Sequence, residues 1–144
     1  MRIVTADASL AGGVAALEQS CFAHPWSRES IGQALNDPQT VVYAALENDA
    51  VIGYIGMQFV LDEGYVLNLA VDAAHRRRGV GSALLQTLVT RCKKESFAFL
   101  TLEVRESNLA ARSLYGSFGF VKVGERKNYY THPAENAVLM TLYF

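Results

Sequence analysis

The chain has 144 residues, of which 51% are hydrophobic and 19% charged, which fits one globular domain over residues 1–144 and excludes a disordered chain. Its formal net charge of -1 argues against a general nucleic-acid-binding protein, which is normally basic over a whole face. No apolar run approaches the roughly 20 residues of a membrane span, and the N-terminal MRIVTADASL lacks the apolar core of a signal peptide, so we expect a cytoplasmic protein without a membrane partner.

The first third of the chain predicts one strand and two helices. Residues 2–6 have the composition of a short strand, and Ser9 can cap the helix that follows. The apolar side chains of that helix recur at the spacing of one helical face: Leu10, Val14, Leu17 and Cys21. After a break at Pro25, Ser27 can cap a second helix, which must end before Pro38 because the residue preceding a proline is pushed out of the helical region.

The middle of the chain predicts a sheet that begins antiparallel and gains one parallel strand. Residues 41–46 and 51–60 flank a short turn and form a hairpin, and a further turn leads to a strand over 65–71. Apolar residues at four-residue spacing predict a long helix over about residues 79–94. Because a strand over 97–104 follows that helix, the crossover rule makes it parallel to strand 65–71.

The last part of the chain predicts a short helix and a closing pair of strands. Asn108 can cap a helix over 109–118 that stops at Gly119, and residues 120–127 and 136–144 are typical of strands. The expected fold class is therefore α/β with a mixed sheet, mostly antiparallel, with one central parallel pair and flanking helices.

The cysteines and histidines show no spacing typical of a metal site, so we expect no metal. Cys21 and Cys92 fall at helical core positions and are expected to be ordinary buried thiols. The three histidines are expected to face solvent: His24, His75 and His132.

The most informative stretch is RRRGVG, at the start of the predicted helix 79–94. A helix N-terminus carries unpaired amide hydrogens and a partial positive charge. Gly79 and Gly81 lack Cβ atoms, so a bulky anion can approach those amides, and Arg76, Arg77 and Arg78 add positive potential. The pattern indicates a diphosphate site, although a solvated basic turn could have the same sequence.

Two other phosphate-binding patterns fit less well. No Lys-Ser or Lys-Thr follows the glycines, which excludes a Walker loop. A dinucleotide fingerprint would use Gly79, Gly81 and an acid such as Glu103, but Leu84 stands where the third glycine belongs. A doubly wound sheet also needs repeated crossovers, and this chain offers one.

The pattern Arg76-x-x-Gly79-x-Gly81 after a strand resembles the acetyl-CoA pyrophosphate loop of the GNAT superfamily of N-acetyltransferases. The resemblance runs over nearly the whole chain and is strongest to the bacterial ribosomal-protein-alanine N-acetyltransferases. It is carried by HPWS (24–27), VLDE (60–63), NLAVD (68–72), LEVRESNLAA (102–111), SLYGSFGF (113–120) and RKNYY (126–130). It implies the GNAT fold, in which the central parallel strands splay apart. It also implies acetyl transfer from acetyl-CoA to the N-terminal α-amino group of a protein, such as the alanine of a ribosomal protein.

Transferred position by position, the resemblance implies a role for each matching residue. Backbone groups of the predicted strand 65–71 would line the pantetheine arm: Leu69, Ala70 and Val71. The loop and the helix start would hold the diphosphate: Arg76, Arg77, Arg78, Gly79, Val80, Gly81 and Ser82. Asn108 would hydrogen-bond the cofactor near its reactive end, with Glu103 as general base and Tyr115 as general acid. Three aromatic residues would border the peptide cleft: Trp26, Tyr129 and Tyr130.

The spacing of these residues suits the chemistry. Glu103 falls at the carboxyl end of strand 97–104, where open α/β sheets bind ligands. Asn108 and Tyr115 lie about two helical turns apart and can face the same way. Deprotonating an α-amine with a pKa near 8 costs only about 1 kcal/mol at pH 7, against about 4.6 kcal/mol for a lysine, so one modest base favours a protein N-terminus.

Other interpretations of these residues and of the whole chain stay open at this point. Tyr115 could be a core tyrosine, and Glu103 an exposed carboxylate paired with Arg105 or Arg112. Trp26 could fill the core between the first two helices rather than border a cleft. The chain could acetylate lysines or small amines, or bind acyl-CoA without catalysis. We expect direct transfer in a ternary complex, by a monomer or weak dimer.

Overall fold

One seven-stranded sheet, in the order β1-β2-β3-β4-β5-β7-β6, organises the computed structural model, which describes residues 1–144. Its strands are β1 (Arg2–Thr5), β2 (Thr40–Glu47), β3 (Ala50–Val60), β4 (Glu63–Val71), β5 (Phe99–Arg105), β6 (Val121–Tyr130) and β7 (Glu135–Tyr143). The helices are α1 (Ala11–Cys21), α2 (Arg28–Asn36), α3 (Val80–Lys94) and α4 (Leu109–Ser117). All strand pairs are antiparallel except β4 with β5, which confirms the predicted mixed sheet.

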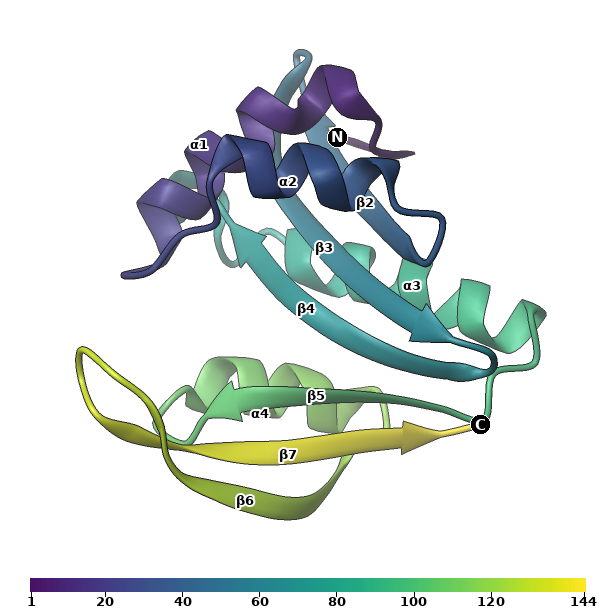
Figure 1. The fold of residues 1–144 in the computed structure, drawn as a ribbon, viewed down its shortest axis with the longest axis vertical. Coiled ribbons are helices and arrows are strands. Elements are labelled where there is room, and N and C mark those ends of the chain that lie inside the picture. Colours follow the sequence, from purple (N-terminus) through teal and green to yellow (C-terminus); the bar gives the residue numbers. More distant parts are fainter.

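The parallel pair is short, and the sheet opens beyond it. β4 and β5 pair only at Glu63 with Phe99, Gly64 with Leu100 and Tyr65 with Thr101. From there the strands diverge, and Figure 1 shows a wedge between a half made of β1–β4 and a half made of β5, β7 and β6. The predicted splay is thus confirmed.

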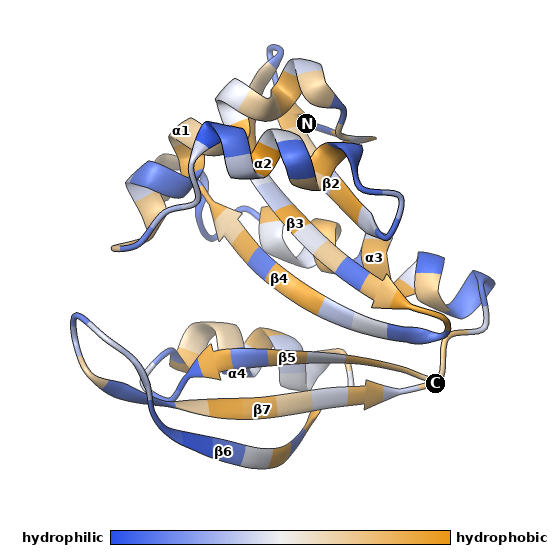
Figure 2. Cartoon of the chain, in the orientation of Figure 1, coloured by the Kyte–Doolittle hydropathy of each residue, from blue (hydrophilic) through white to orange (hydrophobic).

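Helices cover both faces of the sheet. α1 and α2 lie across one face of the β1–β4 half, while α3 packs on the opposite face (Figure 1). The larger apolar core lies beneath α3, where Leu84, Leu85 and Leu88 are buried, and it extends to Tyr115 of α4. The outermost strand β6 is exposed along most of its length and largely hydrophilic (Figure 2), as suits an edge strand that must not pair with another chain.

Most of the predicted helix ends are confirmed, and one is wrong. The hydroxyl of Ser27 accepts a hydrogen bond from Ser30 N at 3.1 Å, and the Asn108 side chain accepts one from Ala111 N at 3.1 Å. Ser9 does not cap the first helix. Instead the Asp7 carboxylate accepts from Ser9 N at 2.9 Å and starts a 3-10 turn, so that α1 begins only after this turn.

No helix in the structure has the combination of length and apolar character that crossing a membrane requires.

Candidate active site

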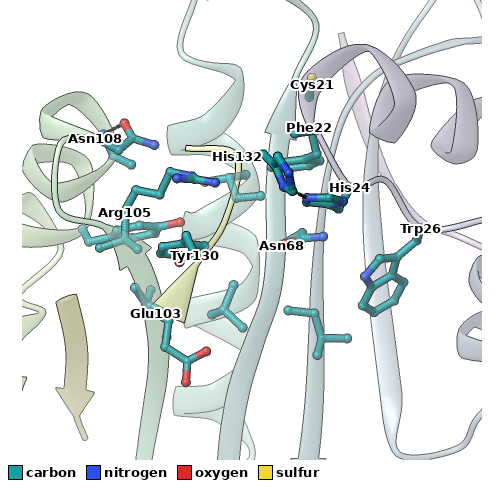
Figure 3. A pocket seen from close by; sticks show the side chains of 18 of the residues that line it. Cys21, Phe22, His24, Trp26, Asn68, Glu103, Arg105, Asn108, Tyr130 and His132 are labelled. Atoms are coloured by element: carbon teal, nitrogen blue, oxygen red, sulfur yellow. Dashed lines mark hydrogen bonds between the residues drawn. The ribbon is translucent and has the colours of Figure 1, made fainter. Parts of the chain in front are cut away.

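A cavity of about 500 Å³ opens where β4 and β5 diverge. It is lined by β4, β5 and α4 together with the α1–α2 loop and the β6–β7 connection. Figure 3 shows Glu103 and Asn108 on one side of this cavity and His24 and Trp26 on the other. Six of the site residues predicted from the sequence line it: Trp26, Leu69, Glu103, Asn108, Tyr115 and Tyr130.

Glu103 reaches the cavity because β5 alternates strictly. Its neighbours Leu102 and Val104 are buried in the core, while the Glu103 side chain is 36% exposed. Tyr129 Oη donates to Glu103 Oε2 at 3.3 Å, and Arg126 Nε lies 3.5 Å from Oε1. The alternative pairing with Arg105 or Arg112 is therefore wrong, since the cation beside Glu103 comes from β6.

Tyr115 belongs both to the core and to the cavity. The residue is 6% exposed, and its ring packs 5.5 Å from that of Phe120, yet it also lines the cavity. Burial raises the pKa of Tyr115 to about 12, so the phenol keeps its proton at neutral pH and can donate it.

The Asn108 side chain uses its carbonyl oxygen within the protein and leaves its amide nitrogen free. Its carbonyl oxygen caps α4 by accepting from Ala111 N. Its Nδ2 donates to no protein atom and remains available to a ligand.

Arg105, which was not among the predicted site residues, holds the β6–β7 side of the cavity in place. Its guanidinium donates to the carbonyls of Thr131 at 3.1 Å and Pro133 at 3.0 Å and pairs with Glu135 at 3.2 Å. The same group lies 4.5 Å from the ring centroid of Tyr130. Tyr130 therefore faces the cavity from a fixed position, whereas its neighbour Tyr129 is outside the lining.

The loop before α3 has an open helix start. Gly79 adopts a φ of 77°, and no side chain caps the amides that follow it. Arg76 Nε donates to Val71 O at 3.2 Å, and Arg78 Nη2 pairs with Glu47 at 3.3 Å. Two of the three arginines thus brace the loop against the protein. The loop residues do not line the cavity, nor do Ala70 and Val71.

The histidines and cysteines differ in part from expectation. His24 and His132 are exposed as predicted, and His24 Nε2 lies 3.2 Å from His132 Nδ1 at the cavity (Figure 3). The prediction is wrong for His75, which is half-buried between Asp72 at 2.7 Å and Glu47 at 2.9 Å. Cys92 is buried as predicted, but Cys21 is only half-buried and lines the cavity. No group of three or more His, Cys, Asp or Glu residues is placed to hold a metal ion.

The chain matches one family model and many known proteins. The model of the acetyltransferase (GNAT) family matches residues 13–120. A [ribosomal protein bS18]-alanine N-acetyltransferase of Haemophilus ducreyi is 41% identical over 133 residues, which span 88% of this chain and 89% of the relative. The corresponding Escherichia coli (strain K12) protein is 38% identical over 128 residues, spanning 88% and 86%. The crystal structure of the ribosomal-protein-S18-alanine N-acetyltransferase from Escherichia coli matches with a TM-score of 0.92 at 34% identity, covering 99% of this chain and 92% of that one.

Proposed function

Because the chain belongs to the acetyltransferase (GNAT) family, whose members use acetyl-CoA, we propose that it acetylates the α-amino group of a protein N-terminus, namely the N-terminal alanine of ribosomal protein bS18. The observation that carries this proposal is the cavity where β4 and β5 diverge, which is lined by a carboxylate and a buried phenol on its β5–α4 side. Relatives named for this alanine are 41% and 38% identical over 88% of this chain, and the crystal structure of the Escherichia coli protein shares the fold over 99% of it.

Glu103 acts as the general base. It is the sole carboxylate that lines the cavity, and its half-exposed position leaves room for an amine or one bridging water. An α-amine with a pKa near 8 needs only about 1 kcal/mol to lose its proton at pH 7, whereas a lysine needs about 4.6 kcal/mol. A single carboxylate is a modest base, which favours the α-amine as the substrate group.

Tyr115 acts as the general acid. Acetyl-CoA supplies the acetyl group as a thioester, and Tyr115 holds a proton for the departing sulfur. The N–C bond forms as the C–S bond breaks, the amine proton passes to Glu103, and the Tyr115 proton passes to sulfur. Burial raises the pKa of Tyr115 to about 12, so the phenol carries this proton at neutral pH.

Acetyl-CoA binding is assigned to three parts of the chain. Beyond Tyr65 the edge of β4 no longer pairs with β5, which leaves backbone groups around Leu69, Ala70 and Val71 for the pantetheine arm. The uncapped start of α3, from Arg76 to Ser82, would hold the diphosphate. The free amide of Asn108 would meet the cofactor near its reactive end.

The test uses an Ala-initiated peptide of bS18, acetyl-CoA and mass spectrometry. Glu103→Gln and Tyr115→Phe should each lower kcat by about a hundredfold or more while acetyl-CoA affinity is retained. Glu106→Gln is the matched control, because Glu106 is exposed and outside the cavity. Unchanged turnover in both variants would refute the two roles. Modification of lysines in place of the N-terminus would refute the proposed substrate.

A further inference from the structure

Glu18 is a fully buried carboxylate that the proposed mechanism does not use. It lies in α1 and is 0% exposed, among buried residues that are otherwise almost all apolar. It forms no ion pair with any cation. A buried carboxylate is costly unless hydrogen-bond donors surround it, so its partners indicate what it is for.

Both oxygens of Glu18 accept hydrogen bonds, and all the donors are neutral. Oε1 accepts from Trp26 N at 3.1 Å and from Asn68 Nδ2 at 3.3 Å. Oε2 accepts from Tyr54 Oη at 2.7 Å and from the same Asn68 nitrogen at 3.3 Å. Burial and then the neighbouring Glu18 raise the pKa of Tyr54 well above its usual value, so this phenol remains a donor.

These donors come from three separate segments. Tyr54 lies on β3, Asn68 lies on β4 and lines the cavity, and Trp26 lies in the α1–α2 loop, which also gives Phe22 and His24 to the cavity wall. Within that loop, the bond from Trp26 N to Glu18 is the only hydrogen bond that ties residues 23–26 to the β1–β4 half of the sheet. The Trp26 residue is 37% exposed, so the hydrogen bond from its backbone to Glu18 adds to what packing contributes to its position.

We propose that Glu18 is a positioning residue for the acceptor: by holding Trp26 and Asn68 together it fixes the cavity wall against which the substrate N-terminus lies. The inference rests on the proposed function, because it requires a peptide in this cavity. Glu103 lies on β5, Tyr115 lies on α4 and Asn108 caps α4; none of them is a hydrogen-bond partner of Glu18. Loss of the Glu18 contacts should therefore weaken peptide binding and leave the chemical step and acetyl-CoA binding intact.

Glu18→Gln tests this arrangement. The glutamine has nearly the same size, but its amide nitrogen would face groups that are themselves donors, so part of the network is lost. The matched control is Glu29→Gln, the same chemical change at an exposed position in α2. Trp26 is the only tryptophan in the chain, so its fluorescence and its quenching by acrylamide report directly on the loop in the free protein.

The expected result for Glu18→Gln is a peptide KM raised about tenfold, the effect of losing one hydrogen bond to a charged acceptor. Its kcat, acetyl-CoA affinity and pH profile should match those of Glu29→Gln, and Trp26 should be quenched more strongly. Unchanged peptide KM and unchanged quenching would overturn the proposal, as would a parallel loss of acetyl-CoA affinity. If Glu18→Gln does not fold, Tyr54→Phe tests the proposal instead. A smaller rise in the peptide KM and in the quenching of Trp26 supports the proposal, and no change in either overturns it.

Failure of the proposed function and failure of the positioning role of Glu18 give different results. If the unmodified enzyme does not acetylate the peptide at all, the proposed function fails. If it does, and Glu18→Gln has the peptide KM of Glu29→Gln, only the positioning role fails.

Discussion

The two glycines at the start of α3 should respond to alanine in opposite ways. Gly79 has a φ of 77°, where a residue with a Cβ pays roughly 1–2 kcal/mol. No heavy atom lies within 4 Å of the Cβ position, so the whole cost is conformational. Gly79→Ala should therefore lower the free energy of unfolding by that amount.

Gly81→Ala should instead stabilise the protein. A Cβ at Gly81 would lie 3.6 Å from Leu114 Cδ2 and 3.7 Å from Val71 Cγ2, which is ordinary van der Waals contact. Alanine is also favoured over glycine in a helix by up to about 1 kcal/mol. A gain of about 1 kcal/mol raises the melting temperature of a chain this size by roughly 3 °C.

The acetyl-CoA affinities of the two variants separate the roles of the glycines. A Cβ at residue 81 would point inward, among apolar side chains, so the expectation that its absence admits the anion is wrong for Gly81. Gly81→Ala should therefore bind acetyl-CoA like the parent. Gly79→Ala should bind acetyl-CoA about tenfold more weakly, because its loop amides are re-aimed. Calorimetric titration measures the acetyl-CoA affinity, and urea unfolding measures the free energy of unfolding. If Gly79→Ala and Gly81→Ala both fold and lose the same acetyl-CoA affinity, the two glycines do not have the different roles inferred from the directions of their Cβ positions.

Three further predictions concern a helix cap, a titration and a loop anchor. Asn108→Ala should lower the unfolding free energy by about 1 kcal/mol in urea titrations, since α4 loses its cap; an unchanged midpoint would contradict this. Burial raises the pKa of Tyr115 to about 12, against about 10 in the unfolded chain, so the free energy of unfolding should be unaffected by this group below pH 10 and should fall as the pH rises toward 12, by up to about 1.4 kcal/mol per pH unit. A free energy of unfolding that rises between pH 10 and pH 12 would contradict this prediction. Arg105→Lys should raise the peptide KM roughly tenfold, because lysine cannot hold Thr131 O and Pro133 O together; steady-state kinetics that match the parent would exclude this anchor.

Local rules account for what the sequence predicted correctly. The alternation of Leu100, Leu102 and Val104 with polar residues placed β5 and turned Glu103 outward, as the structure has it. The caps Ser27 and Asn108 were predictable because each lies within three residues of its partner. The catalytic and binding roles of these residues stay predictions.

Contacts between distant segments account for what could not be predicted. His24 and His132 are 108 positions apart, and the cation beside Glu103 is Arg126 on another strand. Glu18 falls between the apolar residues of α1, and nothing in its local pattern separates a buried carboxylate from an exposed one. Its partners Tyr54 and Asn68 become visible only once β3 and β4 lie beside α1.

The shape of the cavity depends on the point where its two walls meet. β4 and β5 converge at Gly64, where a Cβ would stand 2.9 Å from Met57 Sδ and 3.1 Å from Leu100 Cδ1. Met57 and Leu100 are both fully buried, so neither can move aside cheaply. A side chain at residue 64 would therefore force Met57 or Leu100 to shift within the core. Glycine at residue 64 therefore allows β3, β4 and β5 to pack closely at the point from which β4 and β5 diverge.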